Sequence, residues 1–256
     1  MYAEELEIVA QSAKKKAKLF EAGRWKYYCA SMLGGLYACF GAILAYTIGA
    51  VFHEANSPYG KIAMGLSFGI ALCLISFAGA ELFTSNTFVM TVGLEKKKTS
   101  FKDFLKITSA SWTFNFVGSV IAALLFVMAG VISTSTGEYL THIIEAKISY
   151  SPMELIIRGM LCNTMVCLAT WCTYKMKNEA AKVIMLLWCV LTFMIAGFEH
   201  SIANMGIMSM VYFWQKTTII TLSGILYNLF FVTIGNIIGG AVVIGLGYTY
   251  ISRNKE

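Results

Sequence analysis

The sequence predicts an all-α integral membrane protein with six transmembrane helices, arranged as a 3+3 inverted repeat in which the second and fifth helices are broken. Three observations support this prediction. The 256 residues are 57% apolar and 13% charged, with a mean hydropathy of +0.67, whereas soluble proteins carry roughly a quarter charged residues. Two apolar runs are longer than the roughly 20 residues that one crossing needs. Both runs contain the pattern A-G-x-E-x-x-x-x-N, at residues 78–86 and 196–204.

We treat residues 1–256 as one membrane domain, in which residues 1–25 form an amphipathic N-terminal helix. Apolar side chains recur there at three- and four-residue steps on one face: Leu6, Val9, Ala13, Ala17 and Phe20. Glutamates come first and lysines follow, the order that a helix dipole favours. We expect this helix on the membrane surface, with Lys14, Lys15, Lys16 and Lys18 solvated or facing anionic headgroups. A secretory signal is not expected, because acidic residues precede the basic cluster.

The first repeat is expected at residues 26–132, with spans at 27–51, 62–94 and 107–132. The second of these runs exceeds a single crossing, so we place a break in it at residues 79–86. Its two ends would then form half-helices on either side of the break.

A polar extracytoplasmic loop is expected at residues 133–152, and the second repeat at 153–250. Its spans are placed at 153–174, 183–213 and 217–250, with a break at 197–204 in the over-long fifth run. A short charged tail follows.

The positive charges support six crossings with both termini in the cytoplasm. With alternate sides assigned, all but four of the 20 lysines and arginines fall on one side, which the positive-inside rule identifies as the cytoplasm. The four on the other side are Lys61, Lys147, Arg158 and Lys216.

Weak matches along the chain support an inverted repeat, in which broken helices meet near the midplane. Span one matches span four through pairs that recur in order: Met32 with Met160, Leu33 with Leu161, Cys39 with Cys167, and Tyr46 with Tyr174. Span three matches span six through Gly118 with Gly235 and Ser119 with Asn236.

The breaks hold the ionisable residues at membrane depth, where a charge is costly and marks function. Glu81 and Glu199 occupy equivalent places, and we expect their carboxylates to pin the loops by accepting hydrogen bonds from free backbone N–H groups. The positive ends of half-helices suit anions. His200 follows Glu199 and is the only histidine in an apolar run. It is either a satisfied buried histidine or a group that donates to an anion or shuttles a proton, and Thr84 is a neutral donor in the partner break.

Four motifs together resemble the formate/nitrite transporter family and cover all six spans. They are A-G-x-E-L-F-T at 78–84, A-G-F-E-H-S-I-A-N at 196–204, R-G-x-L-C-N at 158–163 and T-I-G-N-I-I-G-G at 233–240. Among its members, the chain is most similar to the hydrosulfide-channel branch. The resemblance implies an aquaporin-like protomer, a homopentamer in the cell membrane, and one anion pore in each protomer.

The resemblance also implies roles for individual residues. His200 would be the central pore histidine, Thr84 its partner on the other broken loop, and Lys147 the lysine of the loop before span four. Asn163 and Asn236 would complete the polar surroundings of the histidine. The hydrophobic constrictions would be formed by Phe68, Leu72, Leu82, Phe83 and Phe193.

These features predict a channel or transporter, and not an enzyme, for small monovalent weak-acid anions such as hydrosulfide, formate or nitrite. A bare anion between apolar rings loses its hydration at a cost of several kcal/mol, whereas a proton gained near His200 would let the neutral acid pass. Chloride, the anion of a strong acid, would be excluded. Neither a cofactor, a metal nor a nucleic-acid partner is expected.

Two rival functions remain open at this stage. An aquaporin-like pore for neutral solutes also uses broken repeats, but it pairs two Asn-Pro-Ala loops, and neither Pro58 nor Pro152 lies in a break. A membrane redox protein would need two histidines at membrane depth for bis-histidine haem ligation, and only His200 qualifies.

Overall fold

The computed structural model describes residues 2–215 and 219–253. Six helices within these residues are long and apolar enough to cross a membrane. They cover Arg24–Glu54, Gly60–Gly79, Phe101–Met128, Pro152–Lys175, Glu179–Ala196 and Leu222–Ser252. The predicted six-span all-α fold is confirmed.

The first half of the chain contains five α-helices and one π-helical segment. They are α1 (Ala3–Ala22), α2 (Arg24–Glu54), α3 (Gly60–Cys73), η1 (Leu74–Gly79), α4 (Phe83–Glu95) and α5 (Phe101–Met128). The predicted break in the second span is present, and it is shorter than expected, because only residues 80–82 separate η1 from α4.

The second half repeats this order with one π-helical segment near its end. Its elements are α6 (Thr134–Ser149), α7 (Pro152–Lys175), α8 (Glu179–Ala196), α9 (Ser201–Trp214), α10 (Leu222–Ile237), η2 (Ile238–Leu246) and α11 (Gly247–Ser252). Residues 197–200 interrupt the fifth span. The expected start of the sixth span at residue 217 lies outside the described residues.

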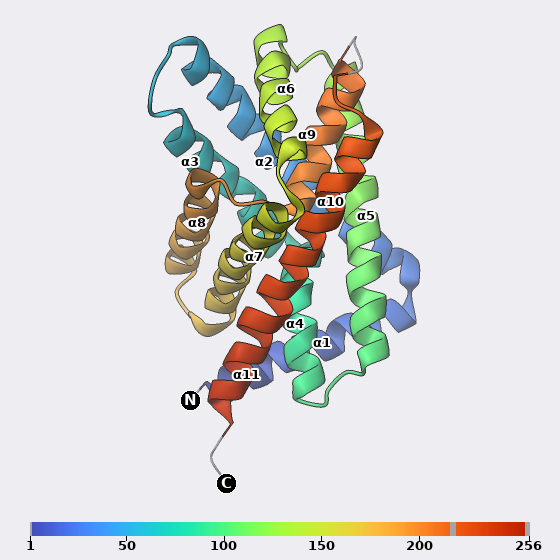
Figure 1. Ribbon diagram of the computed structural model, residues 1–256. Coiled ribbons are helices and arrows are strands. Elements are labelled where there is room, and N and C mark those ends of the chain that lie inside the picture. The colour runs from blue at the N-terminus through green and yellow to red at the C-terminus, as the bar shows by residue number, and fades with distance from the viewer. Residues whose placement is uncertain (1, 216–218, 254–256) are drawn as a thin grey trace.

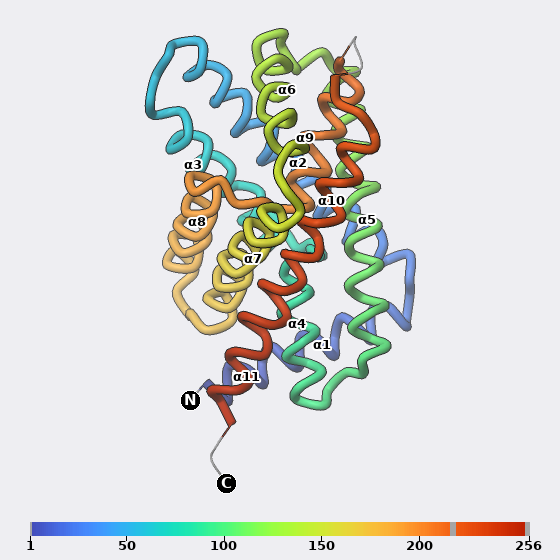
Figure 2. The backbone as a smooth tube through the Cα atoms, viewed as in Figure 1, coloured from blue at the N-terminus to red at the C-terminus, as the bar shows by residue number. Residues whose placement is uncertain are grey.

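The two halves have opposite orientations in the bundle. Helices α1 and α11 lie at one end of the molecule and α6 lies at the other (Figure 1). Each broken span contributes one helix to each end, since α3 and α9 share the end of α6, whereas α4 and α8 share the end of α1 (Figure 2). The two interruptions therefore come together near the middle of the bundle.

The segment expected as an extracytoplasmic loop is a helix. Ser133 caps α6 by accepting a hydrogen bond from the Thr136 N–H at 3.2 Å. One face of α6 is buried, through Thr136, Gly137, Leu140, Thr141 and Ile144. The prediction of a loop was wrong because this face is mixed with polar residues, and its helical spacing becomes apparent only against the neighbouring helices.

Helix α1 packs on the protein as well as facing outward. Four of the five predicted apolar residues are buried, all except Ala17, in a cluster that includes Phe88 and Val89 of α4. Lys14, Lys15 and Lys18 are exposed. Lys16 departs from the expectation of a solvated lysine, because it points into the protein and reaches Glu81.

Glycines fix the register between the outer spans of each half. A Cβ on Gly118 of α5 would collide with the Met32 carbonyl of α2, and one on Gly239 would collide with the Met160 carbonyl of α7. Since Met32 and Met160 are repeat partners, Gly118 corresponds to Gly239. The predicted pairing of Gly118 with Gly235 is one helical turn out of register. Close packing at small residues of this kind is typical of membrane helices.

Candidate functional site

Both helix interruptions begin at a glycine in the left-handed conformation. Gly79 has φ = 87° and Gly197 has φ = 71°, a region that L side chains rarely adopt and that commonly ends a helix. Each glycine is followed two residues later by the glutamate of the repeated motif. The chain then re-enters a helix, α4 or α9.

One asparagine on the opposite helix holds each interrupted backbone. Asn115 of α5 accepts a hydrogen bond from the first N–H of α4 at 2.9 Å and donates to the Glu81 carbonyl at 2.8 Å. Asn236 of α10 accepts from the first N–H of α9 at 2.9 Å and donates to the Glu199 carbonyl at 3.0 Å. Asn115 was not predicted from the sequence, although the correct repeat register pairs it with Asn236.

The carboxylate of Glu81 receives three side-chain donors. Lys16 of α1 approaches its two oxygens at 2.6 and 2.7 Å, the Tyr27 hydroxyl donates at 3.1 Å, and the Asn86 amide donates at 3.0 Å. The sequence offered no sign of the Lys16 contact, because 65 residues separate the partners.

Glu199 has the corresponding arrangement at the other break. Lys147 of α6 donates to it at 2.7 Å and the Asn204 amide at 2.6 Å. Both glutamates therefore bind side chains, and not the backbone N–H groups that we expected. The two asparagines take those N–H groups instead, because they face the helix starts directly.

Each lysine remains an ammonium ion in its pair. Burial acts to lower the pKa of Lys16, but the Glu81 carboxylate outweighs it and the pKa is raised. The pKa of Lys147 is raised in the same way, with Glu199 opposing the effect of burial. Helix α1 thus supplies a cation to the first broken span, and helix α6 supplies one to the second.

His200 caps α9 and faces the first break. Its Nδ1 accepts a hydrogen bond from the Ala203 N–H at 3.1 Å, and its Nε2 lies 3.2 Å from the Thr84 hydroxyl oxygen. Because Nδ1 is an acceptor, this hydrogen-bond network assigns the proton of the neutral ring to Nε2. The ring is 7% exposed and lies against Phe193, at 6.1 Å between ring centroids.

Asn163 and Asn236 support this site through hydrogen bonds to neighbouring groups and not to the imidazole itself. The Asn163 amide lies near three acceptors: the Thr84 carbonyl at 3.2 Å, the Thr87 hydroxyl at 3.0 Å and the Asn236 carbonyl at 2.6 Å. Asn236 holds the backbone on either side of His200. The two asparagines therefore fix the two breaks relative to each other, through the Thr84 carbonyl and the backbone on either side of His200.

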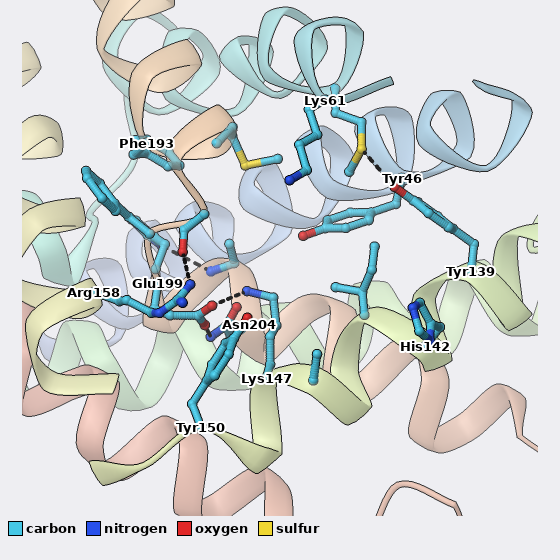
Figure 3. A pocket seen from close by; sticks show the side chains of 18 residues that line it. Tyr46, Lys61, Tyr139, His142, Lys147, Tyr150, Arg158, Phe193, Glu199 and Asn204 are labelled. Atoms are coloured by element: carbon cyan, nitrogen blue, oxygen red, sulfur yellow. Dashed lines mark hydrogen bonds and ion pairs between the residues drawn. The ribbon is translucent and has the colours of Figure 1, made fainter. Parts of the chain in front are cut away.

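Three cavities lie in a row across the protein. The α6 vestibule, of about 260 Å³, is lined by residues that include Lys147, Glu199, His200 and Phe193, and Figure 3 shows their side chains. The α1 vestibule, of about 480 Å³, includes Lys16, Glu81 and Leu82. A central chamber of about 20 Å³ separates them. It shares Phe193 and His200 with the first vestibule, and Ile75 and Leu82 with the second.

The central chamber contains four of the five predicted constriction residues. Its lining is apolar except for His200 and consists of Ala38, Phe68, Ala71, Leu72, Ile75, Leu82, Val166, Val190, Phe193 and His200. Phe83 lines none of the three cavities and is buried in the apolar core. Phe83 is the first residue of α4, and the cavity linings do not support its assignment to the constriction.

Arg158 lines the α6 vestibule, and no role was predicted for it. Its guanidinium donates to the Gly197 carbonyl at 2.9 Å and lies 4.1 Å from the centre of the Tyr150 ring. It therefore stabilises the second break from the vestibule side. Its place in the R-G-x-L-C-N motif is the sequence signal that marks it.

Comparisons with known proteins agree on one family. The family model described as formate/nitrite transporter matches residues 3–250. The nitrite transporter NirC of Escherichia coli is 36% identical, over 98% of this chain and 92% of its own. A solved structure described as an FNT family ion channel has a TM-score of 0.92 at 34% identity, covering 98% of this chain and 99% of its own. A pentameric formate channel with formate bound has a TM-score of 0.78 at 26% identity, covering 89% and 96%.

The Lys147–Glu199 pair yields a prediction for stability. Lys147→Met leaves the Glu199 carboxylate, 2% exposed, without its cation, which costs about 3–5 kcal/mol for a buried pair. We expect a clearly lower thermal unfolding midpoint in detergent, and partial recovery in the double variant Lys147→Met/Glu199→Gln. Arg253→Met, which breaks an exposed ion pair to Glu95, is the matched control and should change little. A Lys147→Met midpoint equal to that of the wild type would contradict the dependence of Glu199 on Lys147.

Proposed function

The chain belongs to the formate/nitrite transporter family, and from this premise we propose that it is a channel for small monovalent weak-acid anions, namely formate, nitrite and hydrosulfide. The single observation that carries the proposal is His200, hydrogen-bonded to Thr84, at the wall of an otherwise apolar chamber of about 20 Å³ between two larger vestibules that each contain a lysine. The similarity to a nitrite transporter and to a pentameric formate channel supports the choice of anions.

The chamber favours substrates that can become neutral. It offers one polar side chain among apolar walls, so a bare anion would lose its hydration there without a countercharge. Formate, nitrite and hydrosulfide each accept a proton and become neutral acids, whereas chloride stays charged. The proposed pathway therefore draws the anion toward Lys147 or Lys16, and passes the protonated acid through the chamber.

The hydrogen bonds of His200 favour a positioning role over proton donation. Charging the ring would place a proton on Nδ1, which already accepts the Ala203 N–H, so protonation would break the cap of α9. The neutral ring still directs its Nε2–H toward Thr84 and the chamber. We propose that this N–H binds one acceptor atom of the anion, while water in a vestibule delivers the proton that neutralises it.

The setting of the channel completes the proposal. It would lie in the cell membrane with both termini in the cytoplasm, as the positive-inside rule indicates. The α6 vestibule would then open to the exterior and the α1 vestibule to the cytoplasm.

A homopentameric assembly is our first functional prediction. The structural similarity to a pentameric formate channel motivates it. Native mass measurement in mild detergent should give five copies of the 28.2 kDa protomer. A stable monomer with full transport activity would refute it.

The second prediction concerns His200. His200→Asn keeps a hydrogen-bond donor but does not place it where Nε2 lies, so we expect a lower formate flux and a higher chloride permeation relative to formate at both pH values. Flux into proteoliposomes at two pH values, for formate and chloride in parallel, measures both effects. His142→Asn, at the exposed rim of the same vestibule, is the control and should behave as the wild type. An unchanged formate-to-chloride ratio in His200→Asn at both pH values would make His200 a structural residue.

The third prediction concerns the chamber walls. Leu82→Ala and Phe193→Ala should raise flux and weaken size selection, because a wider apolar constriction dewets less readily. Phe83→Ala removes a neighbouring apolar side chain that lines none of the three cavities, and its flux per folded channel should match the wild type. The same flux and selectivity in all three folded variants would exclude Leu82 and Phe193 from the pathway.

A further inference from the structure

The α6 vestibule contains a tyrosine whose hydroxyl has no partner among the described residues. Tyr46 of α2 is 7% exposed and lines this cavity, and its hydroxyl points into the open space (Figure 3). Its repeat partner, Tyr174, lines the α1 vestibule and makes a hydrogen bond of 2.8 Å with Ser12 of α1. The two vestibules therefore contain equivalent tyrosines, of which only Tyr46 has its hydroxyl free.

The same vestibule contains a lysine that is available for a ligand. Lys147 is paired with Glu199, and Arg158 is bound to the Gly197 carbonyl. Lys61, at the start of α3, also lines the cavity with its ammonium directed inward. It makes no ion pair in the part of the chain that the structure describes.

In the α1 vestibule, the residue equivalent to Lys61 in the repeat is an acidic one, Glu179. Lys61 precedes Glu81 by the same number of residues as Glu179 precedes Glu199, and Glu179 lines the α1 vestibule together with Lys182. Each vestibule also contains one buried lysine–glutamate pair. With Lys61 and Arg158 in addition, the α6 vestibule is net positive, whereas Glu179 and Lys182 balance each other in the α1 vestibule.

We propose that Tyr46 and Lys61 form an anion-binding subsite in the α6 vestibule, where a small oxyanion such as formate binds before it enters the chamber. The phenol O–H and the ammonium are two donors from two different helices facing one cavity, and an oxyanion offers an oxygen to each. The subsite has no counterpart in the α1 vestibule, since Tyr174 is bound to Ser12 and Glu179 replaces the lysine.

This subsite rests on the proposed function, and it predicts that formate flux saturates differently from the two sides of the membrane. A charge that concentrates anions and a hydroxyl that binds them both lower the concentration at which flux saturates. The channel should therefore saturate at a lower formate concentration from the α6 side than from the α1 side. The charges of the α1 vestibule balance, so it attracts anions less strongly than the α6 vestibule does.

The test measures formate flux in sealed vesicles of each orientation, with sidedness established by protease cleavage of an N-terminal tag on the α1 side. Tyr46→Phe and Lys61→Gln should each raise the half-saturating formate concentration from the α6 side by roughly three- to tenfold, the loss expected for one hydrogen bond of ordinary net strength. Maximal flux should stay unchanged, and half-saturation from the α1 side should shift less than twofold.

Two tyrosines provide matched controls. Tyr139 lines the same cavity, but its hydroxyl donates to the Met64 sulfur at 3.3 Å, so Tyr139→Phe should leave half-saturation from the α6 side as in the wild type. Tyr174→Phe should leave it unchanged as well. A wild-type channel that passes no formate overturns the proposed function and this subsite together. A wild-type channel that passes formate, with Tyr46→Phe and Lys61→Gln unchanged, overturns the subsite alone.

Discussion

The ion pairs at the two helix breaks constrain most of the architecture. A carboxylate at membrane depth needs a cation and hydrogen-bond donors, because burial without them costs several kcal/mol. Glu81 takes its cation from α1 and Glu199 from α6, so both peripheral helices become part of the membrane fold. The broken backbones, in turn, are satisfied by Asn115 and Asn236 from opposite helices. The position of the pore follows from these contacts, because they hold the two helix starts face to face.

Much of the fold was readable from the sequence, since hydrophobic length, charge distribution and a repeated motif each report directly on membrane crossing. The helix breaks were located because two apolar runs exceed a single crossing and both contain the repeated motif; in the structure, left-handed Gly79 and Gly197 lie at these places. Helix α6 was missed, because half of its surface is polar and its burial depends on neighbours far away in the chain. The roles of Lys16 and Asn115 were missed for a related reason. Their partners lie 65 and 34 residues away in the chain, and contacts over such distances cannot be inferred from composition.

Some features of the candidate site were predicted and others were not. The contact between His200 and Thr84, and the apolar walls around them, came from family resemblance, whereas no spacing rule would bring together residues 116 positions apart. The resemblance alone did not separate Phe83, which lines none of the three cavities, from Leu82. The two repeats share their framework and differ at positions that line the proposed pathway. Leu82 stands opposite His200 in the pattern, and Lys61 stands opposite Glu179.

The size of the central chamber has a consequence for the membrane as an insulator. A volume of about 20 Å³ holds roughly one water molecule on this measure, and its walls offer a single polar side chain. A continuous chain of hydrogen-bonded water molecules cannot form across this chamber. Protons therefore cannot be transferred from water to water through it. In the proposed pathway, protons would therefore cross only together with the anion that carries them, one proton for each anion, and not as a separate leak.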